Sequence, residues 1–197
     1  MYDAMAKGLK ANVMRMGNLT NRLSDGRFQK NYESNAFLKR VKGVIELGVL
    51  PDNLLGHYVE FTPVDEAAKA IMTITRSFSD KQTVFHINST KVVYMDQLLK
   101  HLSAIGYSVK VVPENEFSMI LRKTAKESNT KHILEMFIND LDDNDHLNYE
   151  SNIHIDNEFT AQYLKKLGFE WTNIDFDYIK KYIDWFISIG FLSRNHY

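Results

Sequence analysis

The sequence contains no cysteine, and this absence excludes two kinds of chemistry. A chain without thiols cannot build a disulfide scaffold and cannot use a cysteine nucleophile. It fits a reducing compartment, and we therefore expect a cytoplasmic protein. The N-terminus lacks the basic and then apolar pattern of a signal peptide, and no apolar run approaches the about 18 residues of a membrane-spanning helix.

An excess of charge of one sign is also lacking. The 24 Lys and Arg residues balance 25 Asp and Glu residues, which gives a formal net charge of −1. Because the basic residues are scattered, the sequence indicates neither a nucleic-acid surface nor a membrane surface. A hydrophobic content of 44% over 197 residues is enough for one large domain or two small ones.

The spacings of the common metal sites are missing as well. The seven histidines show no H-x-x-x-H or H-E-x-x-H pattern, which zinc sites on helices use. The acidic segment 140–145 fails as a calcium loop, because Asp145 stands where an EF-hand needs glycine and Ser151 where it needs glutamate. We expect no metal site and interpret this segment as a solvated turn.

What the sequence does contain is a short apolar strand that ends abruptly. Residues 12–16 form the expected strand, Gly17 and Asn18 follow it, and a polar loop covers 21–29. Open α/β sheets bind ligands outside the carboxyl ends of their strands, although any strand that leaves a core can look the same. Residues 83–87 predict a second strand, buried on both faces and parallel to the first after a long crossover.

Apolar periodicity and glycine stop signals place the other elements. A helix end is expected at 2–7 and further strands at 58–61 and 108–112. The remaining predicted helices cover residues 31–47, 63–78, 96–105, 116–126, 131–141, 157–167 and 177–189, with a short extension at 152–155. Thr62 has the form of an N-cap and Asp65 that of a capping carboxylate three residues later.

Three blocks carry a family resemblance, and they stand in the right order. The first is R-x-G-N-L-T-x-R-x-S-D-G-x-F-Q at residues 15–29, followed by N-A-F at 35–37, which opens a helix, and F-T-P-V-D at 61–65. Together they resemble the thioester reductase domains that end many nonribosomal peptide synthetases, within the extended short-chain dehydrogenase/reductase superfamily. The similarity is strongest over about residues 7–75 and stays in register to residue 192.

The resemblance implies a fold and an activity. The fold class is α/β: the C-terminal portion of a Rossmann-like sheet over residues 1–90, with a substrate-side loop and helix at 19–60, and a mainly helical substrate-binding subdomain over 91–197. The intact domain would use NADPH to release a peptidyl or acyl thioester from a carrier protein as an aldehyde or an alcohol. Its partners would be the carrier with its phosphopantetheine arm and an upstream nucleotide-binding half.

The resemblance also assigns site residues by position. Met16 and Gly17 fall where the family's backbone passes the nicotinamide. The substrate side would be lined by Asn18, Arg22, Asp25, Phe28 and Gln29. For Arg22, a contact with the phosphate of the arm and a helix-capping or ion-pair role within the protein are equally open.

Two signatures of this superfamily are absent from the sequence. No G-x-G-x-x-G stands between a strand and a helix, since the nine glycines occur singly, and no Tyr-x-x-x-Lys supplies a proton donor. No catalytic residue is therefore assigned, and the chain alone is expected to be inactive and not to bind NADPH.

Two other functions stay open. The chain could be a non-catalytic module that docks a carrier protein or a neighbouring domain, or a sugar-nucleotide epimerase or dehydratase of the same superfamily. Because buried-type strands without neighbours expose their edges, self-association is a further expectation.

Overall fold

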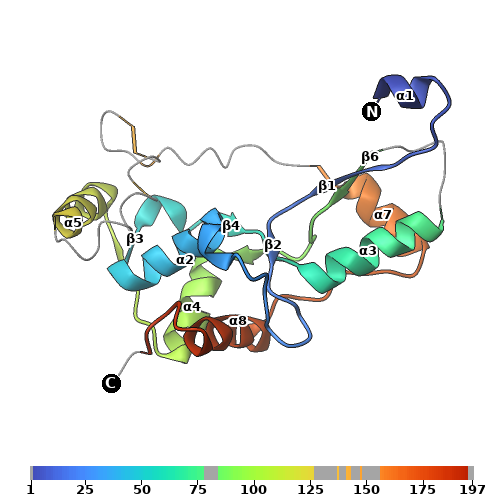
Figure 1. The fold of residues 1–197 in the computed structure, drawn as a ribbon. Coiled ribbons are helices and arrows are strands. Elements are labelled where there is room, and N and C mark those ends of the chain that lie inside the picture. Colours follow the sequence, from blue (N-terminus) through green and yellow to red (C-terminus); the bar gives the residue numbers. More distant parts are fainter. Residues whose placement is uncertain are drawn as a thin grey trace. The chain divides into compact units, whose positions relative to one another are not determined.

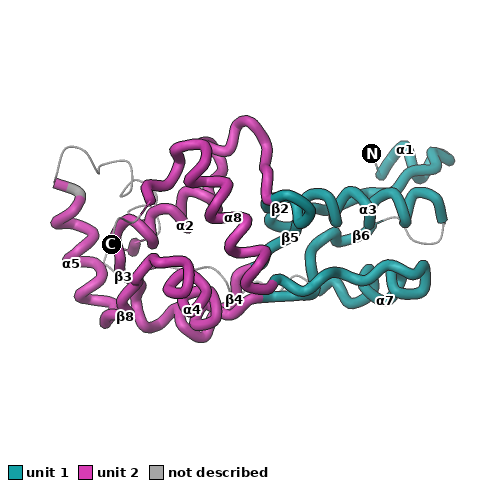
Figure 2. Tube along the Cα trace, turned by 90° about the horizontal axis from the view of Figure 1, so that it is seen from below, with its two compact units in different colours: residues 1–25, 60–92, 154–174 teal, residues 26–59, 93–153, 175–197 magenta. Residues whose placement is uncertain are grey.

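The computed structural model describes residues 2–77, 84–126, 137, 141–142, 147 and 156–194 (Figure 1). The chain divides into two compact units (Figure 2). Unit 1 comprises residues 1–25, 60–92 and 154–174, and unit 2 comprises residues 26–59, 93–153 and 175–197. Each unit is therefore assembled from three separate segments. The division at residue 90 into a sheet part and a helical part stays a prediction about domains.

The centre of unit 1 is a pair of parallel strands (Figure 1). β1 (Val13–Met16) pairs with β6 (Val84–Ile87), and Val13 lies opposite Val84. The parallel pairing predicted from the two apolar runs is confirmed. A second parallel pair joins β2 (Leu19–Thr20) to β5 (Thr62–Pro63).

The burial of β6 differs from the prediction. Phe85 and Ile87 are fully buried, whereas Val84 and His86 are half-buried, so the expectation of burial on both faces is wrong for this strand. The reason is that one face packs on two helices, α3 (Val64–Arg76) and α7 (Glu158–Lys166). The buried residues of this core are Ala67, Ala70, Ile74, Phe85, Ile87, Leu164 and Trp171.

Unit 2 is mainly helical and contains two further short strand pairs. Its described helices are α2 (Ala36–Leu47), α4 (Met95–Ile105), α5 (Glu114–Ala125) and α8 (Phe176–Ser188), with 3-10 turns η1 (Tyr32–Ser34) and η2 (Asp52–Leu54). β3 (Val49–Pro51) runs parallel to β8 (Lys110–Val112), and β4 (Tyr58–Val59) runs antiparallel to β7 (Val93–Tyr94). One core cluster of this unit contains Val49, Leu50, Leu54, Val112, Phe117, Leu121, Phe137 and Leu147.

The start of α2 is set by its N-cap residue and not by the apolar spacing from which the helix was predicted. Asn35 is its N-cap and accepts a hydrogen bond from the N–H of Leu38 at 3.0 Å, so the helix begins at Ala36 and not at residue 31. This is the helix start that the N-A-F block indicated. Gly48, with a φ of 66°, ends the helix in the left-handed conformation that glycine adopts easily.

The remaining helices follow the predicted order within the described ranges. α1 (Tyr2–Ala6) precedes β1, and α8 begins after Asp175, whose carboxylate accepts the N–H of Tyr178 at 3.0 Å. The predictions for 131–141, 140–145 and 152–155 fall wholly or mostly outside the described residues. None of the helices that the structure describes has both the length and the apolar character needed to cross a bilayer.

Candidate functional site

The candidate site of unit 1 lies at the carboxyl ends of β1 and β6. Gly17 and Asn18 directly follow β1, and Asn88 and Ser89 directly follow β6. Because the two strands are parallel, both pairs of residues lie at the same edge, where open α/β sheets bind ligands. Met16, at the end of β1, is 39% exposed. Met16, Gly17 and Asn18 therefore lie at the kind of position that the sequence predicted.

Gly17 is enclosed by two neighbouring side chains. A Cβ at this position would lie 2.0 Å from Oε1 of Glu60 and 2.6 Å from Cβ of Asn88. Its backbone N–H donates a hydrogen bond to the carbonyl of Ile87 at 3.0 Å. The absence of a side chain at Gly17 is thus required by the protein's own packing at this edge.

A chain of hydrogen bonds joins the residues that follow the two strands. Oε1 of Glu60 accepts the backbone N–H of Asn18 at 2.9 Å and the hydroxyl of Thr62 at 2.9 Å. The hydroxyl oxygen of Thr62, which is fully buried, in turn accepts the N–H of Ser89 at 2.9 Å. Glu60 and Thr62 therefore link Asn18, two residues after β1, to the loop after β6.

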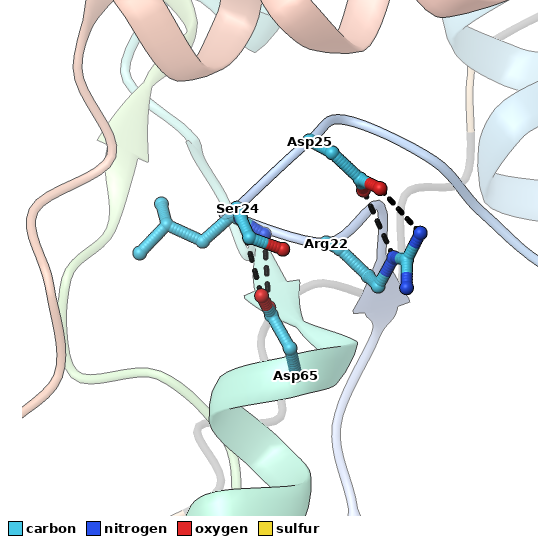
Figure 3. A network of polar contacts seen from close by, with 5 residues as sticks. Arg22, Ser24, Asp25 and Asp65 are labelled. Atoms are coloured by element: carbon cyan, nitrogen blue, oxygen red, sulfur yellow. Dashed lines mark hydrogen bonds and ion pairs between the residues drawn. The ribbon is translucent and has the colours of Figure 1, made fainter.

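Asp65 holds the polar loop that follows β2 (Figure 3). Its carboxylate accepts the backbone N–H of Leu23 at 2.9 Å and that of Ser24 at 3.1 Å. Burial raises the pKa of the Asp65 carboxyl, but the hydrogen bonds from Leu23 and Ser24 outweigh this effect and keep the pKa below its usual value. The carboxylate is therefore ionised at neutral pH and fixes the loop.

The capping interpretation of this region needs a correction. α3 begins at Val64 with Pro63 as its N-cap, so Thr62 is not the N-cap, because its hydroxyl is engaged by Glu60 and Ser89. Asp65 does accept the N–H of Glu66 in the first turn at 3.1 Å. Its contacts with a loop about 40 residues earlier were not expected from the sequence.

Arg22 and Asp25 form an ion pair within the same loop (Figure 3). Nε of Arg22 donates to Oδ1 of Asp25 at 2.9 Å, and the guanidinium Nη2 donates to Oδ2. The two side chains are 43% and 40% exposed, so solvent reaches both. The structure thus contains the ion pair, one of the roles that the sequence left open for Arg22.

The predicted residues are divided between the two units. Met16, Gly17, Asn18, Arg22 and Asp25 belong to unit 1, whereas Phe28 and Gln29 belong to unit 2. Phe28 is half-buried and Gln29 is exposed.

Sequence reasoning missed Glu60, Asn88 and Ser89. A signal for the last two was present, because the rule that selected Gly17 and Asn18 applies equally to the residues after the second parallel strand. In the ranges that the structure describes, no group of three or more His, Cys, Asp or Glu side chains could hold a metal ion.

Comparison with known proteins gives a consistent set of relatives. No family model matches the chain. The chain is 23% identical to a subunit of linear gramicidin synthase from Brevibacillus parabrevis. The aligned stretch of 187 residues covers 95% of this chain and 4% of that protein. It therefore spans only a small part of this curated relative.

Solved structures give the stronger likeness. A thiolation-reductase di-domain from an archaeal nonribosomal peptide synthetase matches with a TM-score of 0.82 and 30% identity, over 96% of this chain and 38% of that chain. The terminal R domain of the myxalamid pathway matches with a TM-score of 0.80 and 20% identity, over 98% and 48% of the two chains. The structural neighbours are thus reductase domains of the extended short-chain dehydrogenase/reductase superfamily, and both the resemblance and the α/β, Rossmann-like fold class are confirmed.

Proposed function

We propose that this chain, whose structural neighbours are reductase domains of nonribosomal peptide synthetases, is the substrate-side, C-terminal part of an NADPH-dependent thioester reductase. The intact domain would release a carrier-bound peptidyl or acyl thioester as an aldehyde or an alcohol. The observation that carries the proposal is the likeness to the archaeal di-domain over 96% of this chain. This relative resembles the chain both in sequence, at 30% identity, and in fold, at a TM-score of 0.82.

The edge of the β1–β6 sheet supports the cofactor part of the proposal. Met16 offers a partly exposed apolar side chain there, next to Gly17, whose side-chain space is filled by Glu60 and Asn88. These residues fit the nicotinamide end of a dinucleotide, which supplies a hydride when bound. The sequence offers no glycine-rich loop for the phosphates, so we expect that this chain alone binds NADPH weakly or not at all.

The residues that follow β1 and β2 support the substrate part. Asn18 is exposed, and its side-chain amide can both donate and accept hydrogen bonds. Arg22 and Asp25 place a charged, solvent-reached pair in the loop that follows β2. We assign these three residues, together with Phe28 and Gln29, to the carrier-bound substrate and its phosphopantetheine arm.

A titration of NADPH followed by fluorescence tests the proposal. It compares this chain with a chain extended upstream by the length of a nucleotide-binding half. We expect binding by the longer chain only, and we expect that chain to oxidise NADPH when an acyl-pantetheine thioester is added. Tight binding by the short chain, or no binding by either, would contradict the proposal.

The missing dinucleotide motif favours a second candidate, a non-catalytic module that docks a carrier protein. Capture of a phosphopantetheinylated carrier by this chain tests it, with the unmodified carrier as the control. Capture without any reduction by the extended chain would favour docking over catalysis.

A further inference from the structure

Asn18 has both of its main-chain polar groups engaged by one neighbouring segment. Its N–H donates to Oε1 of Glu60 at 2.9 Å, and its carbonyl accepts the N–H of Thr62 at 3.0 Å. The side-chain amide belongs to an exposed residue. What Asn18 can offer to a ligand is therefore its side chain, on a backbone that cannot shift without breaking these two bonds.

The carboxylate of Glu60 occupies the space next to Gly17. A Cβ on Gly17 would lie 2.0 Å from Oε1 of Glu60, which is well inside van der Waals contact. In this arrangement glycine at position 17 leaves the space that the Glu60 carboxylate occupies. The same oxygen accepts the hydroxyl of Thr62, so the carboxylate is itself held from a second direction.

We propose that Glu60 is a positioning residue, which holds the Gly17–Asn18 backbone so that the side-chain amide of Asn18 meets an amide of the substrate's pantetheine arm. The pairing is chemically matched, since an amide side chain and a secondary amide each supply one donor and one acceptor. This inference rests on the proposed function, because the carrier-bound thioester of that function brings such an arm to the site. Glu60 itself touches neither the cofactor nor the reacting carbonyl in this assignment.

The test uses three substitutions in the extended chain, assayed with NADPH and an acyl-pantetheine thioester. Glu60→Ala removes the acceptor, whereas Glu60→Gln keeps an oxygen that can accept the Asn18 N–H. Thr172→Val is the structural control. The hydroxyl of Thr172 donates a hydrogen bond to the carboxylate of Glu66, which belongs to unit 1 but lies outside the proposed site. Hydrogen exchange of the Asn18 backbone N–H, measured on this chain, reports the contact with Glu60 and does not require enzyme activity.

We expect Glu60→Ala to speed exchange at Asn18 and to lower kcat/KM about tenfold, mainly through KM, since a hydrogen bond to a charged group is lost. Glu60→Gln should restore kcat/KM to within about threefold of the unsubstituted protein. Thr172→Val should change neither quantity. Faster exchange with an unchanged kcat/KM would overturn the positioning role, as would equal losses in Glu60→Ala and Thr172→Val. An unsubstituted protein that reduces no thioester would instead refute the proposed function and this assignment with it.

Discussion

Asp65 accepts a hydrogen bond from the backbone N–H of Leu23 at 2.9 Å, although the two residues are 42 positions apart. Glu60 makes an equivalent contact with Asn18 at the same separation. Between the two contacts, β2 runs parallel to β5. Residues 18–24 are therefore held along their length by residues 60–65, with a carboxylate near each end.

Replacing Asp65 tests the second of these contacts. We expect Asp65→Asn to lower the free energy of unfolding at pH 7 by about 1 kcal/mol, because a neutral amide is a weaker acceptor and the site is partly open to solvent. Urea unfolding followed by circular dichroism measures the change.

The pH dependence of that difference has a definite sign. The pKa of Asp65 is lower in the folded protein than its unfolded value of about 3.9. Its contribution to stability is therefore fully present above pH about 4 and is lost as the pH falls through the folded pKa. The difference in unfolding free energy between Asp65→Asn and the unsubstituted chain should therefore vanish in acid. A difference that stays constant down to about pH 2 would contradict this account.

Adding a single methyl group at Gly17 should be costly. Gly17→Ala places a carbon against Glu60 and Asn88, and we expect a loss of about 2–3 kcal/mol in the free energy of unfolding, as for other overpacked sites. Gly56→Ala is the control, because a Cβ there meets nothing within 4 Å. Equal unfolding curves for the two variants would contradict the close packing at Gly17.

Thr172 provides a test of the buried carboxylate of Glu66. The hydroxyl of Thr172 donates to Oε1 of Glu66 at 2.7 Å and its N–H donates to Oε2 at 3.0 Å, while Glu66 is only 5% exposed. Thr172→Val leaves one carboxylate oxygen without this partner and should cost about 1.5–3 kcal/mol of unfolding free energy. Thr172→Ser keeps the hydroxyl and should recover most of the loss. The hydroxyl contact would be unimportant if both variants unfolded alike.

Variants of Arg22 distinguish its role in the ion pair from a role in ligand binding. Because both partners are about 40% exposed, loss of the pair in Arg22→Ala should change the unfolding free energy by less than about 1 kcal/mol. If Arg22 binds the phosphate of the carrier arm, the same variant should bind the phosphopantetheinylated carrier about tenfold more weakly. Arg22→Lys keeps the charge without the planar guanidinium, so its affinity for the carrier should lie between those of Arg22→Ala and the unsubstituted chain. Unchanged carrier affinity in Arg22→Ala would leave Arg22 with the ion pair alone.

The elements of the fold were predictable because their signals are local. α4 and α8 start and end within one residue of their predicted bounds, since apolar periodicity and a cap or stop residue mark them in the sequence. The parallel pairing of β1 with β6 followed from two apolar runs separated by a long crossover. The start of α2 was misplaced by five residues, because η1 occupies the stretch before its Asn35 cap.

The hydrogen bonds of the site were not predictable in the same way. Those of Glu60 and Asp65 depend on the pairing of β2 with β5, and each strand has only two residues, too few for a periodic pattern. Gly17 was interpreted as a place where a ligand approaches the backbone. The structure adds a reason within the protein, since Glu60 and Asn88 fill the space of a side chain. A sequence pattern identifies the glycine but does not reveal which neighbour requires it.

The chain passes between the two units five times, because each unit is made of three segments that alternate along the sequence. No single stretch of the gene encodes either unit by itself. A chimaera that replaced unit 2 would have to exchange residues 26–59, 93–153 and 175–197 together, with every junction in register. Recombination with a relative is therefore expected to succeed by transferring both units as one block rather than by exchanging single segments.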